Sequence, residues 1–147
     1  MSDLRDLYQE VILDHNKRPR NFRILPQPTH KAEGVNPLCG DRISVFLDIE
    51  DGIIRDIAFQ GAGCAISSAS ASLMTEALKG KPVTEVEHLL EAFHSVVTTD
   101  CQCPRGLGKL GVLAGVRDYP SRVKCATLAW HAVRAALERH AEPVATE

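Results

Sequence analysis

The feature that most constrains the fold is a pair of alternating segments joined by an Asp-Gly dipeptide. Residues 42–50 and 53–60 alternate in side-chain character, which is typical of strands with two different faces. The residues that share one face are Ile43, Val45, Leu47 and Ile49 in the first segment and Ile53, Arg55, Ile57 and Phe59 in the second. Phe46 is the exception, and Asp51-Gly52 favours a tight turn between antiparallel strands. These segments predict a β-hairpin, with residues 31–37 as a candidate third strand beside it.

Helical patterns lie on both sides of this hairpin. Residues 3–16 repeat apolar side chains at helical spacing and predict an amphipathic helix, followed by a proline-rich irregular arm over 17–30. Further helices are expected over residues 64–79, 84–97 and 124–140. The second of these is expected to begin at a capping box, Thr84-Glu85-Val86-Glu87, and residues 142–147 are expected to fray. The pattern predicts an α+β fold: a small three-stranded antiparallel sheet with helices packed on one face, plus an N-terminal helical arm.

Length and composition restrict the class of protein. The chain has 147 residues, which suits a single domain over 1–147. A net charge of −2 gives no electrostatic reason to expect nucleic acid as a partner, and no apolar run approaches the roughly 20 residues of a membrane helix. The charged N-terminal residues do not resemble a signal peptide, and five cysteines cannot all pair within the chain. We therefore expect a cytoplasmic protein whose cysteines bind metal or take part in chemistry.

Four side chains stand out as candidate metal ligands: Cys39, Asp41, Cys64 and Cys125. Three thiolates and a carboxylate are donor types that zinc prefers, and a tetrahedral site needs four. Purely structural zinc sites are usually built from cysteine and histidine, so the aspartate suggests a site that can be opened. The alternative for any one of these cysteines is a small buried side chain, and their spacing matches no C-x-x-C zinc ribbon.

The chain around each candidate ligand supports the metal hypothesis. Gly40 permits the sharp bend that Cys39 and Asp41 need to share one ion. Cys64 is expected to open a helix, and Cys125 is expected at the start of the last helix, where the helix dipole favours an anion. Three basic residues are expected to offset the excess negative charge: Arg42, Arg122 and Lys124.

The sequence also resembles a known family, the U-type iron–sulfur cluster assembly proteins (the IscU/SufU family), from about residue 4 to 140. The segments that carry the resemblance are Leu7-Tyr8, Asp14-His15, Pro19-Arg20-Asn21, Asn36-Pro37-x-Cys39-Gly40-Asp41 and Phe59-x-Gly61-x-Gly63-Cys64-Ala65-Ile66-Ser67-x-Ala69-Ser70-Ala71-Ser72. The resemblance implies an α+β domain in which Cys39, Asp41, Cys64 and Cys125 surround one metal or cluster.

Two features place the chain nearer the SufU branch of that family. Lys124 stands where the IscU-like scaffold branch has a histidine ligand, and residues 98–121 form an extra stretch before Cys125. A lysine ammonium cannot ligate without losing its proton, so Asp41 remains as the fourth donor. The resemblance to this branch implies bound Zn²⁺ and transfer of sulfur from a pyridoxal-phosphate cysteine desulfurase of the SufS type to downstream iron–sulfur assembly proteins.

The mechanism implied by the resemblance is a zinc-dependent sulfurtransferase. A histidine of the desulfurase replaces Cys39 as a zinc ligand, and the Cys39 thiolate then accepts the persulfide sulfur, so Cys39 is the candidate catalytic residue. The alternative is a scaffold that assembles and transfers a [2Fe–2S] cluster on the same ligands. A third possibility is a purely structural zinc ion.

Other conspicuous residues are interpreted more simply. Cys101 and Cys103 are taken as incidental loop thiols rather than a sulfur-relay pair, and His15 as a packed side chain or partner contact rather than a ligand. Trp130 is expected in the core. The serine run of residues 67–72 is expected to serve close helix packing.

Overall fold

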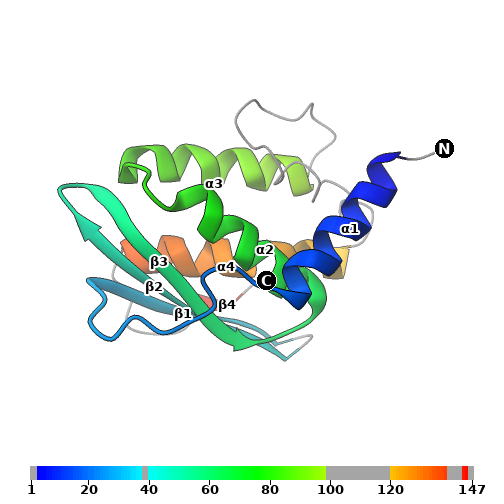
Figure 1. Cartoon of the computed structure of the whole chain (residues 1–147), viewed down its shortest axis with the longest axis horizontal. Coiled ribbons are helices and arrows are strands. Elements are labelled where there is room, and N and C mark those ends of the chain that lie inside the picture. The colour runs from blue at the N-terminus through cyan, green and yellow to red at the C-terminus, as the bar shows by residue number, and fades with distance from the viewer. Residues whose placement is uncertain (1–2, 38–39, 99–119, 139–143, 146–147) are drawn as a thin grey trace.

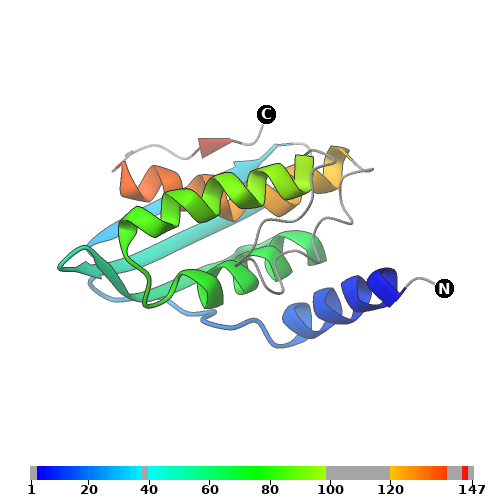
Figure 2. The ribbon, with the colours of Figure 1, turned by 90° about the horizontal axis from the view of Figure 1, so that it is seen from above.

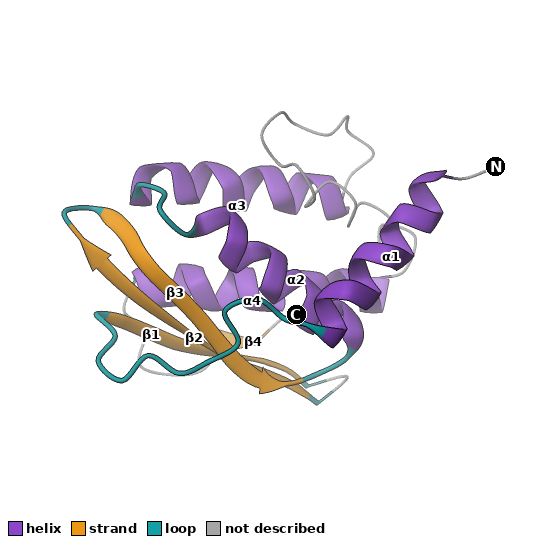
Figure 3. Cartoon of the chain, in the orientation of Figure 1, coloured by secondary structure: helices purple, strands orange, loops and turns teal. Residues whose placement is uncertain are grey.

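The computed structural model describes residues 3–37, 40–98, 120–138 and 144–145. Its elements, in chain order, are α1 (Asp3–Lys17), β1 (His30–Asn36), β2 (Asp41–Glu50), β3 (Ile53–Ala62), α2 (Ala65–Leu78), α3 (Val83–Thr98), α4 (Pro120–Leu137) and β4 (Val144–Ala145). Strands and helices segregate into two layers (Figures 1 and 3). This is the α+β arrangement that the hydrophobic patterns predict.

The sheet has the strand order β3-β2-β1-β4. β1, β2 and β3 are antiparallel, which confirms the predicted three-stranded sheet. The hairpin turn has positive φ at both Asp51 and Gly52, 55° and 74°, as a two-residue turn of the favoured twist requires. The two-residue strand β4 adds a parallel edge beside β1, so the expectation of fraying is wrong for Val144–Ala145.

A β-bulge corrects the predicted face of the second hairpin strand. Asp48 pairs with Asp56, but Ile49 pairs with Ile54, so Arg55 is the extra residue. The bulge reverses the alternation, and Ile54 enters the core while Arg55 is exposed. Ile57 and Phe59 are buried as predicted.

The helices lie on one face of the sheet, as predicted. α4 packs over β1 and β2, and α2 packs over β3; α1 contacts α2, and α3 contacts α4 (Figure 2). Gly34 brings α4 close to the sheet, because a Cβ at Gly34 would lie 3.0 Å from Leu128 Cδ1. Trp130 is 3% exposed and stacks on Phe93 with 4.4 Å between ring centroids, which confirms its place in the core.

The arm between α1 and β1 partly covers the other face. Its backbone pairs with β3 through hydrogen bonds between Asn21, Arg23 and Phe59. Leu25 forms a small apolar cluster with Phe46 and Ala58, which explains why Phe46 breaks the alternation of β2.

Two predicted helix starts are wrong. α3 begins at Val83 and its first turn closes on the carbonyl of Pro82, so the capping box at Thr84 does not mark its start. α4 begins at Pro120 rather than at residue 124. Most of the 98–121 stretch lies outside the described residues. Within the described part of the chain, no helix is long and apolar enough to cross a membrane.

Candidate metal centre

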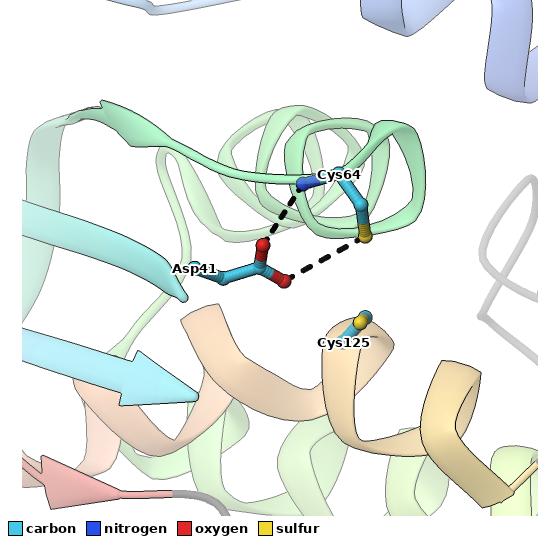
Figure 4. Close-up of side chains that lie close together, drawn as sticks. All are labelled: Asp41, Cys64 and Cys125. Atoms are coloured by element: carbon cyan, nitrogen blue, oxygen red, sulfur yellow. Dashed lines mark hydrogen bonds between the residues drawn. The ribbon is translucent and has the colours of Figure 1, made fainter. Parts of the chain in front are cut away.

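Three of the four candidate ligands converge at one end of the sheet. One ligand atom from each of Asp41, Cys64 and Cys125 lies within 4.8 Å of the others. The side chains come from β2, the N-terminus of α2 and α4, and they face one another (Figure 4). Asp41 and Cys125 are each 3% exposed, whereas Cys64 is half-buried. Cys39 lies outside the described residues, so its predicted place in the site stays a prediction.

Asp41 is positioned by the turn between β1 and β2. Asn36 and Asp41 are paired across the two strands, and the Gly40 N–H donates to the Asn36 carbonyl over 2.8 Å. Gly40 has φ 73°, a left-handed conformation that glycine adopts without strain. As the first residue of β2, Asp41 points to the helix-covered face, together with Ile43 and Val45.

The glycines before Cys64 let the chain pass close to Asp41. A Cβ at Gly61 would lie 2.1 Å from the Arg42 carbonyl oxygen, and a Cβ at Gly63 would lie 3.1 Å from Asp41 Cγ. At Gly61 a side chain would collide with the backbone, and at Gly63 it would crowd the carboxylate. The glycines therefore bring Cys64 beside the carboxylate.

Cys64 is the N-cap of α2, as the sequence predicts. Its sulfur accepts a hydrogen bond from the Ser67 N–H at 3.4 Å, and its own N–H donates to Asp41 Oδ1 at 3.0 Å. Cys64 Sγ and Asp41 Oδ2 are 3.6 Å apart. The start of α2 thus presents a thiol and one backbone N–H, that of Cys64, to the buried carboxylate.

Cys125 is held differently from the prediction. Because α4 begins at Pro120, Cys125 lies in its second turn, and the favourable field of a helix N-terminus falls off within the first turn. Its sulfur instead accepts a hydrogen bond from Asn36 Nδ2 at 3.7 Å. An amide donor stabilises negative charge on sulfur without bringing a charge of its own.

The buried charge of the site fits a divalent cation. Arg42 lies on the opposite face of β2 from Asp41 and forms an ion pair with Glu33 at 2.6 Å, so its expected role in offsetting charge at the site is not supported. Among the ion pairs of the described residues, none includes Asp41. A buried carboxylate beside two thiols needs compensating positive charge, and sulfur and oxygen donors suit zinc.

Sequence reasoning missed two residues at the site. Ser67, interpreted only as a packing residue, is fully buried and its hydroxyl donates to Asp41 Oδ2 at 2.6 Å. Asn36, a motif residue without a predicted role, donates to Cys125 Sγ. The position of Ser67, three residues after the predicted helix N-cap Cys64, could have indicated a contact with the site, because an N-cap side chain accepts from the third residue of the helix.

His15 and the arm residues Arg20 and Asn21 make structural contacts with α2. His15 is fully buried, and its Nδ1 lies 2.7 Å from Ser72 Oγ, which confirms that it is packed. Ser72 also accepts the Arg20 N–H, and Asn21 Nδ2 donates to Thr75, so the arm is attached to α2. Cys101 and Cys103 lie outside the described residues.

Known proteins share both the sequence pattern and the fold. Residues 7–145 match a family model described as the NifU-like N terminal domain. An iron–sulfur cluster assembly scaffold protein IscU from Streptococcus pyogenes is 41% identical over 96% of this chain and 89% of its own length. A zinc-dependent sulfurtransferase SufU from Bacillus subtilis is 39% identical over 90% of each chain. The crystal structure of a nitrogen-fixing NifU-like protein (N-terminal) from Brucella abortus matches with a TM-score of 0.84 at 25% identity, covering 91% of this chain and 94% of that one.

Proposed function

We propose that this chain, which belongs to the family of NifU-like N-terminal domains, is a zinc-dependent acceptor and carrier of persulfide sulfur from a cysteine desulfurase. In coarser terms, it is an iron–sulfur cluster assembly protein of the IscU/SufU family. We further propose that residues 1–147 act as one domain and that the protein works in the cytoplasm with a SufS-type desulfurase and downstream assembly proteins.

One observation carries the proposal: Asp41, Cys64 and Cys125 place their donor atoms within 4.8 Å of one another in a site without a basic ion-pair partner for Asp41 among the described residues. Cys39, two residues before Asp41 in the sequence, is the proposed fourth ligand. Lys124 stands beside Cys125 where scaffold-type relatives are expected to have a histidine, which favours the sulfurtransferase over the scaffold.

The proposed chemistry is a thiol exchange on sulfur. Zinc, when bound, keeps cysteine ligands deprotonated at neutral pH and has no redox chemistry. The Cys39 thiolate attacks the outer sulfur of the desulfurase persulfide. A new sulfur–sulfur bond forms at Cys39 while the old one breaks, and the desulfurase cysteine leaves as a thiolate. Asp41, Cys64 and Cys125 would hold the metal during this transfer.

The second candidate function is a scaffold for a [2Fe–2S] cluster. It is favoured by the 41% identity to a protein that bears the scaffold name and by the thiolate donors, which also suit iron–sulfur clusters. Metal analysis of anaerobically purified protein separates the two functions. Stoichiometric zinc supports sulfur transfer, whereas a brown, iron-bearing protein supports the scaffold.

Alanine release by a SufS-type desulfurase, measured with cysteine and reductant, tests the sulfur-acceptor function. The wild-type protein is expected to accelerate turnover, and Cys39→Ser is expected to abolish the acceleration. Cys101→Ser serves as the matched control and is expected to behave as the wild type. Full acceleration by Cys39→Ser would refute the proposal, and no response to the wild-type protein would favour a purely structural zinc ion.

A further inference from the structure

We propose that Ser67 is a positioning residue that orients the Asp41 carboxylate for metal binding. The inference rests on the proposed metal centre and concerns a residue outside the four expected ligands. Ser67 lies in the first turn of α2, three residues after Cys64, and is fully buried.

Ser67 contacts all three ligands that the structure describes. Its hydroxyl donates to Asp41 Oδ2 at 2.6 Å, and its backbone N–H donates to Cys64 Sγ at 3.4 Å. The hydroxyl oxygen also lies 3.3 Å from the Cys125 carbonyl oxygen. A hydroxyl has one hydrogen, and the shorter, charge-assisted bond to the carboxylate takes it.

Beside the long contact of the Cys64 thiol with Oδ2 at 3.6 Å, two shorter hydrogen bonds determine the orientation of the Asp41 carboxylate (Figure 4). Oδ1 accepts from the Cys64 N–H at 3.0 Å and Oδ2 accepts from Ser67, so rotation about the Cβ–Cγ bond would break both. Both donors belong to the start of α2, which also carries the Cys64 thiol. The carboxylate is therefore held in a fixed orientation relative to one of the sulfur ligands.

Loss of the Ser67 hydroxyl leaves Asp41 Oδ2 with only the Cys64 thiol at 3.6 Å, a donor that is lost when the thiol ionises as a metal ligand. Outer-sphere hydrogen bonds of this kind typically change metal affinity by about 10- to 100-fold. We expect Ser67→Ala to lower zinc affinity within that range while Asp41, Cys64 and Cys125 remain in the chain.

Ser70 provides a matched control on the same helix. It is also fully buried, and its hydroxyl donates to the Ala126 carbonyl. This hydrogen bond connects α2 to α4. Ser70 also accepts from Trp130 Nε1 at 3.2 Å. Ser70→Ala thus removes a comparable buried hydroxyl whose hydrogen bonds, within the described part of the chain, go to Ala126 and Trp130 and not to the three ligands.

The experiment measures zinc affinity by competition with a chromophoric chelator, together with the visible absorption spectrum of the Co²⁺-substituted protein. Ser67→Ala, Ser70→Ala, Asp41→Ala and the Asp41→Ala/Ser67→Ala double variant are compared with the wild type. We expect a loss of affinity and a changed Co²⁺ spectrum for Ser67→Ala, and neither for Ser70→Ala. In the Asp41→Ala background, Ser67→Ala is expected to cause no further loss.

The inference is overturned if Ser67→Ala loses no more affinity than Ser70→Ala, or if its loss persists in the Asp41→Ala background. Thermal unfolding of the metal-free proteins verifies that each variant folds. If Ser67→Ala does not fold, Ser67→Gly is used in its place to remove the hydroxyl. A wild-type protein that binds no zinc would instead refute the metal centre itself, so the two failures are distinguishable.

Discussion

Gly63→Ala is expected to separate metal affinity from folding stability. A Cβ at Gly63 would lie 3.1 Å from both Cγ and Oδ1 of Asp41, whereas ordinary contact begins at 3.4 Å. The carboxylate must therefore move by about 0.3 Å. Metal–ligand distances in well-formed sites agree with their standard values within about 0.2 Å, so a shift of this size is expected to weaken binding. We expect about a tenfold loss of zinc affinity, equivalent to about 1.4 kcal/mol.

The folding stability of the metal-free protein is expected to change little in Gly63→Ala. Gly63 does not have a positive φ, so alanine meets no backbone strain there. Replacing such a glycine reduces the entropy of the unfolded chain and stabilises by about 0.4–1 kcal/mol. This gain offsets the crowding against Asp41.

Gly52→Ala is a control with the opposite expected result, a change in stability without a change in zinc affinity. Gly52 lies in the β2–β3 turn with φ 74°, and the space around its Cβ position is open. The substitution is expected to cost about 1–2 kcal/mol of stability through backbone strain and to leave zinc affinity unchanged. Chelator competition and urea unfolding of the metal-free protein give the two quantities. Wild-type zinc affinity in Gly63→Ala would refute the reasoning that the glycine makes room for the ligand.

Three further predictions concern the fold around the site. Asp56→Asn is expected to destabilise the protein at pH 7 by up to about 1 kcal/mol, because the hydrogen bond from Arg23, aided by the Ile57 N–H and Lys79, holds the pKa of Asp56 below 3.8. The ionised carboxylate stabilises the fold above that pH and loses its effect as pH falls through the lower folded value, so urea midpoints of variant and wild type should converge in acid. Burial, with the nearby charges of His94 and Arg134, lowers the pKa of His131 below 6.5. Stability should therefore fall as pH drops below 6.5, and less so in His131→Gln than in the control His88→Gln; equal pH dependence would contradict this. Gly61→Ala should strongly lower the unfolding temperature, since its Cβ would lie 2.1 Å from the Arg42 carbonyl oxygen; a wild-type melting temperature would contradict the observed strand register.

Local sequence patterns predicted the hairpin and the start of α2 at Cys64, and they singled out the candidate ligands Asp41, Cys64 and Cys125 that the fold brings together. Each depends on short-range causes: alternation along a strand, the positive φ of Asp51-Gly52, and the preference of a helix N-terminus for a capping acceptor. These causes act within a few residues, so they can be recognised from the chain alone.

The tertiary structure alone decided which distant groups meet. The β-bulge at Arg55 depends on pairing between two strands, and the burial of Phe46 depends on Leu25 in the arm. The contacts of Asn36 with Cys125 and of Ser67 with Asp41 join residues 89 and 26 positions apart. No local pattern encodes such contacts, because they arise from the packing of α2 and α4 on the sheet. The sequence thus identified candidate ligands for a metal, and packing determined which polar groups hold them.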